Sequence, residues 1–158
     1  MSVYFELKNS FLIGRSNKYE GIYEYFNNKK IFSMSELFTL CAVIGFTNNR
    51  KVDFRSDSKN KGKDIRSEYF ANNELMNIYT IMIKSQDIKA NIDDFANYEF
   101  IRSAFRIIEQ YAEGGMEILC EDVFCDNWDK DTLLGGNEKH YEADILNYIN
   151  AKRSEDKF

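Results

Sequence analysis

The chain has 158 residues, 44% of them hydrophobic, and a formal net charge of −5. This composition excludes a disordered chain, and the length is that of one domain with a substantial core. The acidic total argues against a free-standing nucleic-acid-binding module, because such modules are usually basic.

The first residues carry a pattern typical of β-structure. Apolar and polar residues alternate from Val3 to Leu7, and residues 11–13 are apolar, which predicts two short strands joined by a turn at 8–10. No basic segment leads into an apolar one here, so we expect no export signal. A cytoplasmic protein with reduced thiols is the corresponding prediction for the three cysteines.

Two helices are predicted next. Residues 18–27 have apolar side chains at i, i+3, i+4 and i+7, as on one face of a helix. The following stretch, residues 33–51, is apolar on every side in its middle, which is typical of a buried helix. Its apolar run is about half of what a bilayer crossing needs, so we assign it to the core and expect no membrane contact. Ser33 and Glu36 have capping-box spacing, and Gly45 is predicted to end the helix.

A basic segment follows. Between Arg50 and Arg66 there are seven basic and three acidic residues, a net +4, which leaves −9 for the rest of the chain. We predict a flexible basic loop over residues 55–65. Two interpretations remain open: phosphate contacts with nucleic acid, or an ordinary solvated loop. The candidate nucleic-acid-binding residues are Asn48, Asn49, Arg50, Lys51, Arg55, Lys59, Lys61 and Lys63.

Helical spacing also dominates the second half of the chain. It predicts helices over residues 73–85, 95–112 and 138–151, with a short helix at 116–125 after a stop or kink at Gly114-Gly115. Residues 152–158 are expected to fray. The predicted fold is mainly α: a single compact helical domain over residues 1–158, with five to six helices. A minor two- or three-stranded β element is expected near the N-terminus.

Residue types suited to catalysis or metal binding are present but poorly arranged. His140 is the one histidine and lies in a polar stretch, which favours a surface role over a catalytic one. The spacing of Cys120 and Cys125 does not fit a structural zinc site that would include His140. The aspartates of the following loop miss the calcium-loop spacing: Asp126, Asp129 and Asp131.

Two further patterns contain residue types found in carboxylate active sites or in phosphate-binding loops. Glu117, Glu121 and Asp122 share one predicted helix, where an acidic surface is the simpler explanation than a carboxylate active site. Gly135-Gly136 is not followed by the Lys-Ser/Thr pair of a phosphate-binding loop. We therefore predict no catalytic residue, no metal and no cofactor, and expect a protein that is not an enzyme.

Two segments together resemble a known family: LFTLCAVIGFTNNRK (37–51) and YAEGGMEIL (111–119). They are similar to the small accessory proteins associated with bacterial DNA phosphorothioation (dnd) gene clusters and related phage-defence operons. The matching positions are Gly45, Phe46, Asn48, Arg50, Tyr111, Gly114, Gly115, Glu117 and Leu119. The resemblance implies a defence-associated accessory subunit, and it carries over no catalytic residue.

The leading hypothesis is therefore a non-catalytic interaction subunit that binds larger proteins of the same operon. The alternatives are a nucleic-acid-binding accessory module that uses the basic loop, with DNA contacted inside a complex, and an enzyme of unrecognised type. Homo-oligomerisation is left open. Structurally, the motif residues Gly45, Phe46, Tyr111, Gly114 and Gly115 are expected to bring their two segments together, because glycine allows close backbone approach.

Overall fold

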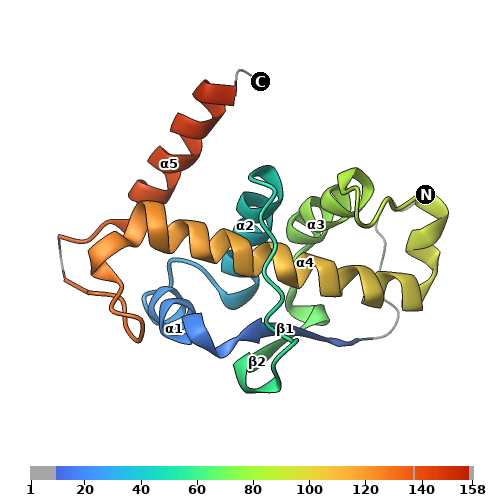
Figure 1. Ribbon diagram of the computed structural model, residues 1–158, viewed down its shortest axis with the longest axis horizontal. Helices are drawn as coiled ribbons and strands as arrows, with labels where there is room; N and C mark the ends of the chain where they lie inside the picture. Colours follow the sequence, from blue (N-terminus) through green and yellow to red (C-terminus); the bar gives the residue numbers. More distant parts are fainter. Residues whose placement is uncertain (1–9, 137, 157–158) are drawn as a thin grey trace.

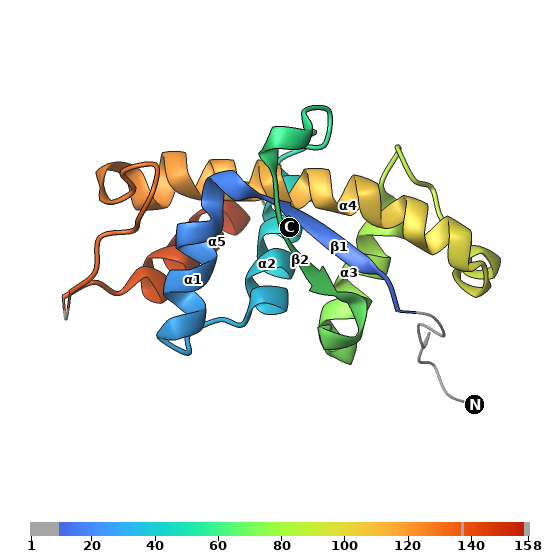
Figure 2. The same cartoon turned by 90° about the horizontal axis from the view of Figure 1, so that it is seen from below.

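The fold is built along one long helix, α4 (Tyr98–Leu119), which runs the length of the molecule (Figures 1 and 2). The structure is a computed structural model that describes residues 10–136 and 138–156, with side-chain burial up to residue 153. Thirteen residues of α4 are buried. Because its buried positions continue almost without a break from residue 108 to residue 119, this half of α4 is enclosed on several sides.

The described part of the chain has four other α-helices: α1 (Glu20–Asn28), α2 (Met34–Thr47), α3 (Asn72–Lys84) and α5 (Tyr141–Asp156). In Figure 2, α1, α2 and α3 lie side by side on one side of α4. The prediction of a mainly helical fold is confirmed. Helix α5 continues to Asp156, through most of the range that was predicted to fray.

Helix α2 begins as its sequence predicts. The Ser33 side chain accepts the N–H of Glu36 at 3.2 Å, and the Glu36 side chain accepts the N–H of Ser33 at 3.2 Å, which completes the capping box. The predicted end at Gly45 is wrong by two residues. The left-handed residue is Asn49, at φ 52°, and the N–H of Arg50 returns to the carbonyl of Gly45 at 2.8 Å.

The predicted stop at Gly114-Gly115 is also wrong. Helix α4 passes through both glycines without interruption and continues into a π-helical turn, Cys120–Phe124. Glycine inside a helix costs roughly 1 kcal/mol relative to alanine, so two in succession need a compensating contact. Both are buried where α4 meets α2 and the segment after it.

The β element is a two-stranded antiparallel sheet of β1 (Leu12–Ser16) and β2 (Lys61–Arg66). Its central pair is Ile13 with Ile65, and both side chains are buried. The partner of β1 therefore comes from the basic segment and not from the hairpin predicted at the N-terminus, whose first strand lies outside the described residues. The strand and a preceding 3-10 turn, Ser58–Asn60, occupy much of the range predicted as a flexible loop.

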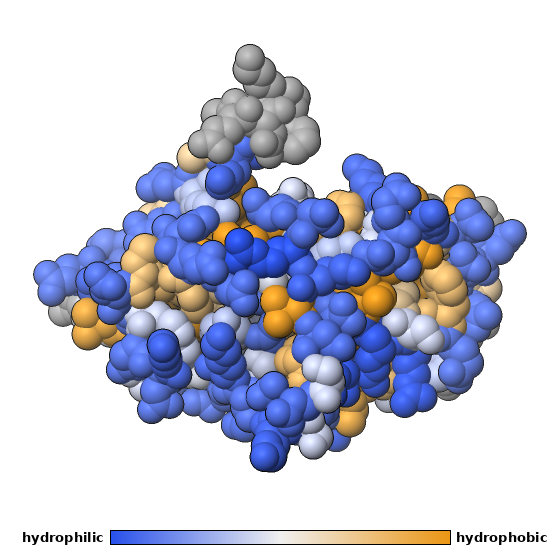
Figure 3. Space-filling view, viewed as in Figure 1, coloured by the Kyte–Doolittle hydropathy of each residue, from blue (hydrophilic) through white to orange (hydrophobic). Residues whose placement is uncertain are grey.

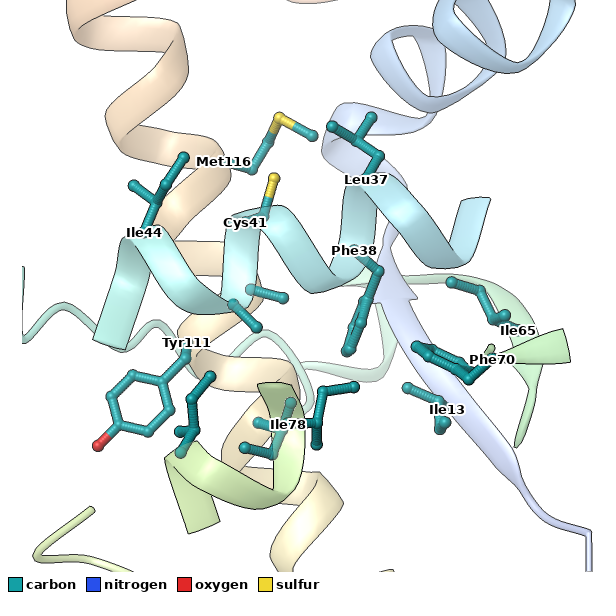
Figure 4. Packing of buried hydrophobic residues seen from close by; sticks show 14 of the residues in the cluster. Ile13, Leu37, Phe38, Cys41, Ile44, Ile65, Phe70, Ile78, Tyr111 and Met116 are labelled. Atoms are coloured by element: carbon teal, nitrogen blue, oxygen red, sulfur yellow. The ribbon is translucent and has the colours of Figure 1, made fainter. Parts of the chain in front are cut away.

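The core lies where α2 crosses α4 and extends to the sheet. Figure 4 shows Cys41 of α2 beside Met116 of α4, and Phe38 beside Phe70 on the side toward Ile13 and Ile65. Phe38 and Phe70 meet edge to face, with ring centroids 5.7 Å apart. Each fully buried large side chain of this kind stabilises the fold by about 1.5–3 kcal/mol. Within the described residues, none of the helices is both long and apolar enough to cross a membrane.

Candidate functional site

The two glycine motifs meet at the crossing of α2 and α4. A methyl group added at Gly115 would overlap the carbonyl oxygen of Cys41, and one added at Gly45 would overlap the carbonyl oxygen of Tyr111. The two backbones therefore touch directly, which only residues without a side chain permit. The prediction that Gly45 and Gly115 lie together is confirmed, although neither of them ends its helix.

The segment that leaves α2 continues this backbone contact. The carbonyl of Arg50 lies against Gly114, where a side chain would overlap it. Two residues later, the N–H of Val52 donates to the carbonyl of Gln110 at 3.0 Å. These contacts hold the exit from α2 flat against α4, and the left-handed residue Asn49 makes the turn that places it there.

Aromatic residues close one side of the crossing. The rings of Phe46 and Tyr111 meet edge to face, with centroids 5.5 Å apart. The Tyr111 hydroxyl lies 2.9 Å from the hydroxyl of Ser85, just beyond α3. Lys51 lies 5.9 Å from the centre of the same ring and binds Asp87 at 2.5 Å, which lowers the pKa of the Asp87 carboxyl. All five residues of the predicted structural motif thus gather at this junction.

The basic side chains of the predicted nucleic-acid-binding set mostly bind carboxylates of their own chain. Arg50 binds two residues of α4 and the π-turn, at 3.1 and 2.9 Å, and these hydrogen bonds raise its pKa. The carboxylate partners, in order from Arg50, are Glu117 and Glu121 for Arg50, Asp87 for Lys51, Glu109 for Arg55, Asp64 for Lys61, and Glu24 and Glu20 for Lys63. Within the described residues, Lys59 alone of the six cations has no carboxylate partner.

The two asparagines of that set serve the helix end. The Asn48 side-chain amide donates to the carbonyl of Ile44 at 2.8 Å, and Asn49 supplies the left-handed turn. The structure thus brings Asn48, Asn49, Arg50 and Lys51 together at the crossing. Lys61 and Lys63 lie apart from them on β2, which pairs with β1.

Glu109 of α4 accepts more of these charged hydrogen bonds than the other carboxylates described here. Its side chain is 1% exposed. It accepts from Arg55 at 2.6 and 3.0 Å, from Arg106 at 2.7 Å and from the N–H of Gly14 at 2.6 Å. One buried carboxylate therefore joins the basic segment, α4 and β1. Breaking a buried ion pair by removing one partner typically costs 3–5 kcal/mol.

One helical turn further along α4, Glu113 binds the last residue of β1. It accepts the hydroxyl of Ser16 at 2.7 Å, and burial raises the pKa of its carboxyl to about 7. Nearby, Arg15 is 4% exposed, lies 3.1 Å from Glu20 and stacks 4.4 Å from the centre of the Tyr23 ring. A cavity of about 10 Å³ adjoins these side chains, room for a single water molecule.

Sequence reasoning missed Glu109, Glu113 and Arg15. The available signal was the four-residue spacing of Glu109, Glu113 and Glu117 beside the apolar stripe of α4. Such a row of acids next to a core needs cations to neutralise it, and the excess of basic residues in Arg50–Arg66 supplies most of them.

The other residues considered for chemistry lie apart from this junction. His140 is exposed just before α5, and Cys125 is exposed while Cys120 is partly buried. Asp129 accepts the N–H groups of Asp131 and Thr132 at 2.9 and 2.7 Å, which holds the pKa of its carboxyl below the usual range. Among the residues that the structure describes, no three His, Cys, Asp or Glu side chains are grouped so as to hold a metal ion.

A family model decides the relationship of this chain. The model described as DNA sulphur modification system-associated protein 4 matches residues 16–156. The chain belongs to this family. Neither the curated proteins nor the solved structures contain a match.

The match to the DNA sulphur modification system-associated protein 4 family includes both glycine motifs, the basic segment and α5. Membership agrees with the resemblance in the two motif segments and shows an association with DNA sulphur modification systems. The description of the family names no reaction and no ligand, so the function has to be argued from the surface of the molecule.

Proposed function

We propose that this protein is a non-catalytic accessory subunit of a DNA sulphur modification system. It acts in the cytoplasm by binding a larger protein encoded in the same operon. The observation that carries the proposal is the exposed face of α3. Seven residues of α3 are exposed, and six of them are uncharged: Asn72, Asn73, Met76, Asn77, Thr80 and Ile83, with Lys84 as the exception.

This face has the chemistry of a protein contact. Met76 is 47% exposed and Ile83 is 51% exposed, and they lie two turns apart on the same side of α3. The centres of protein interfaces are poor in charged residues and rich in Met and aromatic side chains. Tyr69, in the 3-10 turn (Ser67–Tyr69) ahead of α3, is 67% exposed and adds an aromatic ring near this helix.

The charged groups of the chain support the same proposal. Four carboxylates of α4 and its π-turn bind arginines or a serine of their own chain: Glu109, Glu113, Glu117 and Glu121. Side chains that are used in this way hold the fold together. On the face seen in Figure 3, hydrophobic atoms appear as small islands among hydrophilic ones.

The test is co-purification from a host that carries the intact system. A tagged wild-type protein is expected to recover the product of a neighbouring gene, as identified by mass spectrometry. The Met76→Asp/Ile83→Asp variant should lose it, because two carboxylates would be desolvated in the contact.

The matched control is Ser103→Asp, at an exposed position of α4. It should retain the partner, and circular dichroism should show that all three proteins are folded. If the wild-type protein recovers no product of the system, the proposed function is wrong. If the α3 variant binds as well as wild type, the partner contacts another surface.

A further inference from the structure

Helix α5 is set apart from the rest of the molecule. It projects away from the body in Figure 1. Tyr141 and Ile145, each 1% exposed, anchor its first half, and Tyr148 and Ile149 are partly buried further along. Leu146, between these anchors, is 61% exposed.

One face of α5 carries four side chains in a defined order. Glu142, Leu146, Ile149 and Arg153 are spaced by four, three and four residues, so they form a single stripe along the helix. The stripe runs from an acid through two large aliphatic residues to a base. Within the described residues, Glu142 and Arg153 form no ion pair.

This order is complementary to itself when it is reversed. Within one α5, the midpoint of Glu142 and Arg153 and the midpoint of Leu146 and Ile149 both fall between Asn147 and Tyr148. A second α5 can therefore lie antiparallel to the first about this point. Leu146 then faces Ile149 of the second copy, and Glu142 faces its Arg153, twice in each dimer. A two-fold contact requires this kind of self-complementarity.

The surface beside the stripe offers room for such a partner. A groove of about 270 Å³ lies between α2 and α5, walled by Leu40, Val43 and Ile44 on one side and by Tyr148 and Ile149 on the other. Ile149 and Arg153 belong both to the groove and to the stripe. A helix seated on the stripe would border this groove at Ile149 and Arg153.

We propose that two copies of this chain pair through antiparallel α5 helices, with Glu142 of each bound to Arg153 of the other. This contact uses a different helix from the α3 face and does not depend on the proposed function. Each copy would keep its α3 available, so the dimer presents two partner-binding faces.

The experiment measures the mass of the full-length protein by sedimentation velocity over a range of concentrations. Wild type should show a concentration-dependent dimer. Glu142→Arg and Arg153→Glu, made singly, should each raise the dissociation constant by roughly tenfold or more, because each places two like-charge contacts in the dimer. The double variant Glu142→Arg/Arg153→Glu should recover the dimer, since it exchanges the charges without losing complementarity.

A second set of variants tests the apolar part. Leu146→Asp should abolish the dimer, whereas Asn147→Asp, one residue away and off the stripe, should leave it intact. Thermal unfolding of each variant shows that it is folded. A monomeric wild-type protein overturns the proposal, as does a double variant that is folded but still monomeric. Loss of an operon partner from the Leu146→Asp variant, with its mass unchanged, would instead assign this face to that partner.

Discussion

Helices α2 and α5 lie on either side of the same groove but are held by different means. Helix α2 is apolar on nearly every side, and its backbone touches that of α4 at Gly45 and Gly115. Helix α5 is held by side chains, chiefly Tyr141 and Ile145. A backbone contact fixes one position and one crossing geometry, whereas side-chain anchors leave most of a helix surface available. Helix α2 is therefore part of the scaffold, and α5 is the helix that we propose as a contact surface.

The largest loss of stability is expected from a side chain added where α2 and α4 cross. In Gly115→Ala the added methyl group overlaps the carbonyl of Cys41, so α2 and α4 have to separate. We expect the free energy of unfolding to fall by roughly 3 kcal/mol, at the upper end of overpacking effects. Urea unfolding, followed by circular dichroism, measures the change.

The matched control is Gly135→Ala, where the new methyl group would lie 3.6 Å from the Tyr25 ring, an ordinary contact. It should change stability by less than about 0.5 kcal/mol. Alanine has a higher helix propensity than glycine. If there were room for a methyl group between α2 and α4, Gly115→Ala would therefore be neutral or stabilising. That result would contradict direct backbone contact between α2 and α4.

The stability of the contact between α4 and β1 should depend on pH through Glu113. Burial raises the pKa of Glu113 to about 7, with Lys18 opposing the shift and Glu117 adding to it. The folded protein therefore holds this proton more tightly than the unfolded chain, whose Glu titrates near its usual value of about 4.3. The contribution of Glu113 to stability is complete below that value and is lost as pH rises to about 7.

The loss amounts to about 3–4 kcal/mol, because each pKa unit corresponds to about 1.4 kcal/mol. Glu113→Gln cannot titrate, so relative to wild type it should be more stable at pH 8 than at pH 5. Urea unfolding of both proteins at the two pH values gives the difference. An offset between variant and wild type that is the same at pH 5 and pH 8 would show that Glu113 has an ordinary pKa.

The smallest effect is expected on α5. Leu146→Ala should change the free energy of unfolding of the monomer by less than about 0.5 kcal/mol, because this side chain is 61% exposed. Ile145→Ala, the neighbouring residue at 1% exposure, is the control and should cost about 2–4 kcal/mol. Both are measured by urea unfolding at low protein concentration. Equal losses at the two positions would mean that Leu146 packs against the body.

The sequence predicted the helices because their signals are local. Apolar spacing located α1, α3 and α4, and the capping box located the start of α2. The glycines were misread for the same reason. A glycine in a helical pattern resembles a helix end locally, and only the second helix shows that close approach is needed at Gly45, Gly114 and Gly115.

The candidate site was predicted only in part. Its two motifs were found, and their meeting was expected, but the partners of the cations were not. Arg55 and Glu109 are 54 positions apart, and no local pattern links them. The pairing of β1 with β2 was missed for the same reason, since β2 is short, polar and rich in lysine. Charge balance between segments was the one long-range signal, and it was interpreted either as a nucleic-acid contact or as a solvated loop, not as a set of ion pairs within the chain.

The contact between Gly45 and Gly115 also determines where the chain can change length. These residues are 70 positions apart, 115 minus 45, so their contact closes a long loop that contains β2 and α3. Doubling a loop costs only about 0.6 kcal/mol in closure entropy. Insertions in the exposed turn Ser56–Asn60 should therefore be accepted readily, whereas a single methyl group at the crossing should not. The molecule tolerates added length along the chain and resists added thickness between its helices.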